Sequence, residues 1–467
     1  MPQDRAAALD LLTQLGRHPF EFQAEAAARC AAAMSRGQRV VVQAPTGAGK
    51  TLIAFVAIAI AAAKKGRWRG LMSVPSRPLL RQHVVDAGWL RQRVPLQFVV
   101  PQDATPIWRA ALDSPRGLIC TTPHSLKNRL SRLGGLEAFP PWDVAMFDEI
   151  DVFVTKELDG RKDIWPLVAQ CAEANVPMIG FTGTVLNDDQ AEYWQENGFV
   201  AYRPDIDEHW LPFTRVWFIG ITNQRVQAAD ERIRQDLGRA YDRFRDEGGN
   251  PRSWKQITNE ARRAGALGDA ARSILALHSD RLQLFEGGDD VGGKVTAMCD
   301  WLSHRTALVL CRYVETAVSV ARHLASAGIT AVQADGTMRA AEVERRATLF
   351  RRGGADALVM TRDLGGRGLD FPQADSVLLL SPRSNYQTVA QELARIRSRR
   401  SITKDTAVLF YERTAETAKA SRLAEHLIHR NRYGDMKLFD VVNAPEPIDL
   451  DPFDRQHLYL EETRGDL

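Results

Sequence analysis

The chain has 467 residues, of which 45% are hydrophobic and 25% are charged, and its formal net charge is +3 at pH 7. This composition is typical of a globular protein with two or three domains, and it argues against long disordered regions. The five cysteines are scattered without a C-x-x-C pair, which indicates neither a zinc site nor a disulfide framework. The small net charge leaves a nucleic-acid partner open, because basic residues act through local clusters.

The sequence also bears on location. The longest apolar run, residues 52–63, is too short to span a bilayer, and residues 1–20 lack a signal-peptide pattern. We therefore expect a cytoplasmic protein with no membrane partner.

Strand-like apolar runs alternate with helical stretches twice along the chain, a pattern typical of α/β proteins with parallel sheets. The first half predicts strands over 39–42, 70–74, 96–100, 117–121, 144–148 and 178–182. The second half predicts strands over 306–311, 330–333, 357–360, 376–380 and 407–411. We expect four parts: a first lobe (1–205), a linker and helical insertion (206–290), a second lobe (291–432) and an acidic tail (433–467).

The insertion is rich in arginine between residues 225 and 281. These arginines form either a solvated helix face or a nucleic-acid contact, and the sequence alone favours neither.

A glycine-rich segment, A-P-T-G-A-G-K-T over residues 44–51, joins an apolar strand to a helix, and we call it the phosphate loop. Gly47 and Gly49 allow backbone N–H groups to close around phosphates, and Lys50 places its ammonium on the outer phosphates. The Thr51 hydroxyl reaches Mg²⁺. The segment therefore predicts a nucleoside triphosphate site formed by Thr46, Gly47, Ala48, Gly49, Lys50 and Thr51.

The run V-A-M-F-D-E-I-D over residues 144–151 is a buried-type strand that ends in carboxylates, and we call its last four residues, D-E-I-D at 148–151, the acidic box. An aspartate at a strand end can hold Mg²⁺ through water, and the next glutamate can orient the attacking water and accept its proton. We assign Asp148 to magnesium and Glu149 to general base, while Asp151 links the box to neighbouring elements.

Together with T-G-T at 182–184 and T-R-D-L-G-G-R-G-L-D at 361–370, these motifs resemble the superfamily 2 helicases over about residues 20–411. The resemblance implies an α/β fold of two RecA-like parallel-sheet lobes with a helical insertion between them. It also implies that ATP binds in the cleft between the lobes and that a nucleic-acid strand lies across their top.

The resemblance assigns further roles to single residues. Gln23 would read adenine through its amide, and Gly368 and Asp370 would face the nucleotide. Thr182 and Thr184 would couple the ATP site to the nucleic acid. The residues expected to contact the nucleic-acid backbone are Pro75, Ser76, Arg77, Thr122, Pro123, Arg312 and Thr361.

The segment Q-E-L-A-R-I-R-S-R over 391–399 is similar to the family motif Q-x-x-G-R-x-x-R, which supplies arginine fingers to the nucleotide. Gln391 and Arg395 align with it, whereas Ser398 stands where the second arginine is expected. Arg395 and Arg399 share a helix face, so our hypothesis makes them the two fingers, with Arg397 as the alternative to Arg399. Gln391 is assigned, like Thr182 and Thr184, to coupling between the ATP site and the nucleic acid.

DEAD-box RNA helicases typically begin this last motif with histidine and read D-E-A-D in the acidic box, whereas this chain has Gln391 and D-E-I-D. We therefore expect an ATP- and Mg²⁺-dependent helicase or translocase that hydrolyses ATP and binds DNA, in preference to RNA, through its backbone. The alternatives are an RNA helicase of the same fold and an ATPase subunit that clamps or remodels a nucleoprotein complex without unwinding. The insertion or the acidic tail could bind a protein partner.

Overall fold

Parallel strands and helices make up most of the residues that the structure describes, as the hydrophobic pattern predicts. The computed structural model describes residues 2–14, 20–45, 47–65, 68–74, 80, 83, 97–99, 116–122, 142–150, 171, 175–183, 194–196, 198–206, 214–251, 253–286, 293–303, 305–365, 371, 374–382, 386–393, 405–413, 416–429, 432–433 and 436–446. The chain divides into two compact units, the first built mainly from Met1–Leu211 and the second mainly from Pro212–Gly366 and Asp370–Arg432. None of the described helices is both long enough and apolar enough to cross a membrane.

The first lobe has a seven-stranded sheet of order β3-β4-β2-β5-β6-β1-β7, and its paired strands are parallel. Its strands are β1 (Arg39–Gln43), β2 (Trp68–Ser73), β3 (Gln97–Val99), β4 (Arg116–Thr121), β5 (Val144–Asp148), β6 (Met178–Thr182) and β7 (Phe199–Tyr202). The six strands predicted in the first half correspond to β1–β6, and β7 was not predicted.

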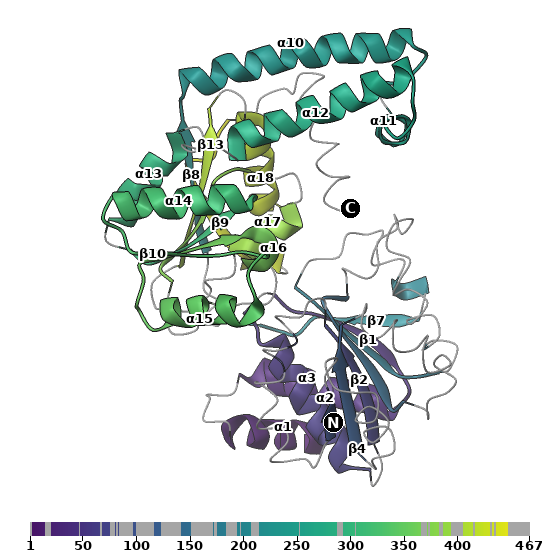
Figure 1. Cartoon of the computed structure of the whole chain (residues 1–467). Coiled ribbons are helices and arrows are strands. Elements are labelled where there is room, and N and C mark those ends of the chain that lie inside the picture. Colours follow the sequence, from purple (N-terminus) through teal and green to yellow (C-terminus); the bar gives the residue numbers. More distant parts are fainter. Residues whose placement is uncertain are drawn as a thin grey trace. The chain divides into compact units, whose positions relative to one another are not determined.

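Three helices of this lobe pack together (Figure 1): α1 (Pro2–Gln14), α2 (Glu21–Ser35) and α3 (Lys50–Ala63), and α2 also contacts β1 and β6. Residues 53–62 of α3 are all buried, because the helix is apolar on every side and so must lie inside the lobe. The many alanines of α2 pack against α3 and leave little space between the two helices. The phosphate-loop helix is therefore held on all sides by the core.

The second lobe also has a seven-stranded parallel sheet, of order β10-β11-β9-β12-β13-β8-β16. Its strands are β8 (Thr214–Ile221), β9 (Ala307–Cys311), β10 (Ala331–Ala334), β11 (Ala357–Thr361), β12 (Ser376–Leu379), β13 (Asp405–Glu412) and β16 (Phe439–Val442). Its helices are α13 (Lys294–Leu302), α14 (Val314–Ser326), α15 (Ala340–Arg351), α16 (Arg362–Gly365), α17 (Tyr386–Leu393) and α18 (Thr417–His429). The short strands β14 (Arg432–Tyr433) and β15 (Met436–Lys437) pair with each other. The two sheets confirm the predicted fold class.

The helical insertion consists of α10 (Gln224–Asp246), α11 (Trp254–Glu260) and α12 (Ala266–Glu286), and Figure 1 shows α10 and α12 as a long pair. Asn223 caps α10 by accepting the N–H groups of Arg225 and Val226 at 3.0 and 3.3 Å. The three helices bury a small core of their own, which includes Leu237, Tyr241, Phe244, Trp254, Ile257 and Ile274.

The bounds of this insertion differ from those expected from the sequence. Strand β8 lies within the predicted linker (206–290), yet it pairs with β13 and β16 in the second sheet. Strand β16 likewise lies within the predicted acidic tail. The helices 224–286 are therefore inserted inside the second lobe, because the sheet uses one strand before them and six after them.

Candidate nucleotide and nucleic-acid site

The predicted motifs of the first lobe follow strands whose carboxyl ends share one edge of the sheet. The phosphate loop follows β1 and the acidic box follows β5, and β6 with Thr182 at its end lies between these two strands. The Ala44 N–H donates to the Thr182 carbonyl at 3.0 Å, so the loop begins bonded to the predicted coupling strand. Ligands of parallel α/β sheets bind at this edge.

The phosphate loop has the backbone that its glycines predict. Gly47 and Gly49 have φ angles of 89° and 82°, a left-handed conformation that is strained for other residues, and Gly49 is the cap from which α3 starts. The Lys50 Nζ donates to the Ala44 carbonyl at 3.1 Å, so its ammonium lies back over the loop. Thr46 lies outside the described residues.

Gln23 contacts the same loop from α2. Its side chain is 1% exposed, and its Nε2 donates to the Ala48 carbonyl at 2.7 Å. The structure thus brings Gln23 to the phosphate loop, where its amide holds the loop backbone. The adenine contact remains a prediction.

The acidic box places its first two carboxylates at the end of β5. Asp148 is buried and accepts the Glu149 N–H at 3.1 Å, while Glu149 has a φ of 50°, unusual for a residue with a side chain. Ile150 packs so closely on Gly180 of β6 that a Cβ at Gly180 would lie 2.4 Å from its Cδ1. Asp151 lies outside the described residues.

A residue that the sequence analysis did not single out, His83, completes this site. Its Nε2 lies 3.3 Å from Asp148 Oδ2 and 3.4 Å from Thr51 Oγ1, and the side chain is 1% exposed. Burial raises the pKa of Asp148, but the hydrogen bond and charge of His83 and the charge of Lys50 outweigh it, so the pKa lies below its ordinary value. The available signal was the histidine directly after the predicted strand-contacting segment 74–82.

The side-chain oxygens that meet at this site are suitable ligands for a magnesium ion. The Thr51 hydroxyl and the Asp148 carboxylate are hard oxygen ligands, and both lie within 3.4 Å of the same nitrogen. Magnesium sites of this kind use one or two protein oxygens and the substrate phosphates. The pair is therefore suited to Mg²⁺ that arrives with a nucleotide.

The predicted nucleic-acid contacts are described only in part. Thr122 lies buried after β4, where the Val74 N–H donates to the Thr121 carbonyl at 2.9 Å. Thr361 ends β11 and is 6% exposed. Residues Pro75, Ser76, Arg77, Pro123 and Thr184 lie outside the described residues, as do Gly368, Asp370, Arg395, Arg397 and Arg399, while Gln391 lies on α17.

Arg312, at the end of β9, is bound to the base of the insertion. Its Nη1 lies 3.5 Å from the Glu286 Oε1 at the end of α12, and the Thr316 hydroxyl donates to the Glu286 carbonyl at 2.8 Å. At the other end of the insertion, Gln227 Nε2 donates to Glu412 Oε1 at 3.0 Å. Both ends of the insertion are thus fastened to the second lobe, one of them at a predicted nucleic-acid-binding residue.

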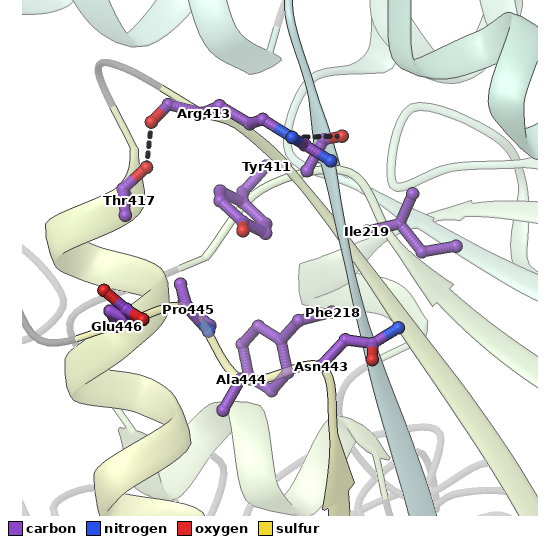
Figure 2. Close-up of a pocket in the computed structure, with 10 residues that line it drawn as sticks. Phe218, Ile219, Tyr411, Arg413, Thr417, Asn443, Ala444, Pro445 and Glu446 are labelled. Atoms are coloured by element: carbon purple, nitrogen blue, oxygen red, sulfur yellow. Dashed lines mark hydrogen bonds between the residues drawn. The ribbon is translucent and has the colours of Figure 1, made fainter.

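A pocket of about 520 Å³ opens where β8 and β13 end, and Figure 2 shows it between Tyr411, Phe218 and the segment after β16. The Arg413 Nε donates to the Gly220 carbonyl at 3.1 Å along its rim. The residues expected from the sequence to bind nucleotide or nucleic acid do not line this pocket.

Two parallel-sheet lobes, the first with a phosphate loop and an acidic box at one sheet edge, define the class of two-lobed RecA-like proteins. Comparison with protein families is more specific: residues 21–192 match the family "DEAD/DEAH box helicase", and residues 293–399 match "Helicase conserved C-terminal domain". The chain belongs to the superfamily 2 helicases. Comparison with curated proteins gives no significant match.

Solved helicase structures share this fold at low sequence identity. The Pyrococcus furiosus Hef helicase domain is 18% identical with a TM-score of 0.58, over 88% of this chain and 98% of that one. The Mycobacterium smegmatis helicase Lhr, bound to ssDNA and AMP-PNP, is 16% identical with a TM-score of 0.58, over 90% of this chain and 49% of that one. S. cerevisiae Dbp5, bound to RNA and ADP BeF3, is 13% identical with a TM-score of 0.54, over 97% and 98%.

Proposed function

We propose that this protein is an ATP- and Mg²⁺-dependent helicase or translocase that acts on nucleic acid, on DNA in preference to RNA. The observation that carries the proposal is the convergence of Lys50, Thr51, Asp148 and Glu149 at one sheet edge of a helicase-family chain. Lys50 binds the outer phosphates, and Glu149 orients the attacking water and accepts its proton. Thr51 and Asp148 would hold Mg²⁺, which supplies positive charge against the phosphates when a nucleotide is bound.

The preference for DNA rests on Gln391 and on the D-E-I-D box, both of which differ from the DEAD-box pattern. The solved structures do not decide between DNA and RNA, since Lhr was solved with ssDNA and Dbp5 with RNA. Binding is proposed to use the nucleic-acid backbone, so it should weaken steeply as salt rises and depend little on sequence. Arg395 and Arg399 remain the proposed arginine fingers.

The test is ATP turnover by the full chain with single-stranded DNA, duplex DNA, branched DNA and single-stranded RNA, each at saturation. We expect stimulation by nucleic acid and the largest stimulation by DNA. The proposal fails if turnover is the same with and without nucleic acid, and the DNA preference fails if RNA stimulates more.

A strand-displacement assay on the best-stimulating substrate separates unwinding from remodelling. ATP-dependent displacement supports a helicase. Hydrolysis without displacement supports a translocase or remodelling subunit, for which the helical insertion with its own core offers a partner surface.

A further inference from the structure

His83 lies between the two predicted magnesium ligands, although the segment directly before it, 74–82, is expected to contact nucleic acid. Its Nε2 is 3.3 Å from Asp148 Oδ2 and 3.4 Å from Thr51 Oγ1, which is within hydrogen-bond reach of both oxygens. One nitrogen of a buried ring therefore contacts both groups that suit the metal.

Packing holds the imidazole in this position. Phe55 lies four residues after Thr51 on α3, so the two side chains share a helix face. The Phe55 ring meets the His83 ring edge-on, with centroids 6.0 Å apart and an interplanar angle of 71°. Helix α3 thus supplies both a polar and an aromatic contact to the same imidazole.

The chemistry of the contact follows from the donor inventory. The ionised Asp148 carboxylate can only accept, so Nε2 carries the proton and donates to it, and the Thr51 hydroxyl oxygen can accept from the same N–H. The two oxygens that suit Mg²⁺ are thereby turned toward one donor. Removing a group that orients metal ligands in this way typically lowers metal affinity or activity by about 10- to 100-fold.

We propose that His83 is a positioning residue that holds the Thr51 hydroxyl and the Asp148 carboxylate converged for Mg²⁺ and nucleotide. Because it follows the predicted strand-contacting segment 74–82 directly, it also joins that segment physically to the metal ligands. This inference rests on the proposed function, since it presupposes that the site binds a nucleotide with Mg²⁺.

The experiment measures how much Mg²⁺ tightens nucleotide binding. A fluorescent ATP analogue is titrated into the full chain once with excess Mg²⁺ and once with EDTA, and the ratio of the two Kd values is the metal linkage. His83→Leu fills the space against Phe55 but removes the N–H. We expect its linkage to fall by about 10-fold, with little change in the EDTA Kd.

Two polar variants keep the test decisive if His83→Leu does not fold. Glutamine can place an amide N–H near the Nε2 position, whereas asparagine is too short. We expect His83→Gln to retain the wild-type linkage and His83→Asn to lose it. The inference is overturned if Asn and Gln behave alike, or if His83→Leu folds and keeps the wild-type linkage.

A matched control is His278→Leu, which removes another buried histidine, bonded to the Tyr241 hydroxyl at 2.8 Å in the insertion. It should lower the unfolding temperature and leave the linkage unchanged, and a lowered linkage would overturn a specific role for His83. A wild-type protein that binds no nucleotide refutes the proposed function instead. The two failures are therefore distinguishable.

Discussion

Each lobe buries a carboxylate near the carboxyl ends of its strands, and the two carboxylates are held in opposite ways. Asp148 lies beside His83 and Lys50 at the phosphate loop, and its pKa is below the ordinary value because these groups outweigh burial. Glu416 lies at the start of α18, where burial raises its pKa and Lys294 and the Ser381 hydroxyl offset this only in part. The corresponding edges of the two sheets therefore carry two kinds of polar cluster.

The partners of the second carboxylate explain the difference. Lys294 is completely buried, with its Nζ 2.5 Å from Glu416 Oε2 and 3.1 Å from the Phe285 carbonyl, while the Glu412 N–H donates to the same Oε2 at 2.8 Å. These contacts tie α12, α13, β13 and α18 together. We infer that the cluster around Glu416 stabilises the fold, whereas the cluster around Asp148 serves a ligand.

The largest expected effect comes from the first cluster. Glu149→Gln should lower ATP turnover by about 10²- to 10⁴-fold, because the amide cannot accept the proton of the attacking water. Nucleotide affinity and the free energy of unfolding should change little. Steady-state turnover and urea unfolding check this, with the exposed Glu247→Gln as control, and a Glu149→Gln enzyme with wild-type turnover would contradict the assignment.

Changes in the cluster around Glu416 should lower the free energy of unfolding. Lys294→Met leaves Glu416 buried without its cation and should lower the free energy of unfolding by about 3–5 kcal/mol. Lys294 is one of the groups that lower the pKa of Glu416, so its removal raises that pKa further above the ordinary 4.5, and the stability that a raised pKa contributes is lost as pH rises through it. The loss should therefore be larger at about pH 8 than at about pH 5 in urea unfolding.

The control for this variant replaces both charges. Lys294→Met with Glu416→Leu removes the buried carboxylate as well, and it should recover much of the lost stability. Equal stability of Lys294→Met and the wild type would show that the cluster does not hold the helices together.

Substitutions at two glycines distinguish the cost of backbone strain from an effect on nucleotide binding. Gly49 and Gly37 both have positive φ, 82° and 70°, so each change to alanine should cost about 1–2 kcal/mol of stability. Only Gly49→Ala should also weaken nucleotide binding, because Gly37 lies in the turn after α2. Urea unfolding and nucleotide titration measure the two effects, and a nucleotide defect in Gly37→Ala would remove the distinction.

The smallest expected effect concerns the exposed charges of the insertion. Arg245 pairs with Asp242 at 3.1 Å, and both side chains are more than half exposed, so Arg245→Ala should change stability by less than about 1 kcal/mol. Because the arginine is neutralised on its own helix, the salt dependence of nucleic-acid binding should not change. A slope reduced by about one unit would instead indicate a phosphate contact.

The sequence predicted the strands with strong apolar runs and missed those whose role depends on distant partners. Strand β7 exposes Val200 beside buried Phe199 at the sheet edge, so its run is weak. Strand β8 looked like part of a linker, and its pairing with β13 joins segments far apart along the chain. The phosphate loop and acidic box were predictable because glycine geometry and strand-end carboxylates are local properties.

His83 could not be assigned in the same way. No spacing joins Thr51, His83 and Asp148, and their meeting arises only once β1, β2 and β5 lie in one sheet. Arg312 likewise gave no sign of its contact with Glu286, which joins the second lobe to the end of α12.

The insertion is fastened at both of its ends to the second lobe, by Gln227 with Glu412 and by Glu286 with Arg312 and Thr316. Helix α10 has 23 residues and so extends about 35 Å. Both anchors lie at the same end of the α10–α12 pair, so the pair can act as a lever fixed at that end. A small rotation of the second lobe would then displace the opposite end, around α11, by an amount that grows with this length. A partner bound at that end would therefore be displaced further than one bound on the lobe itself.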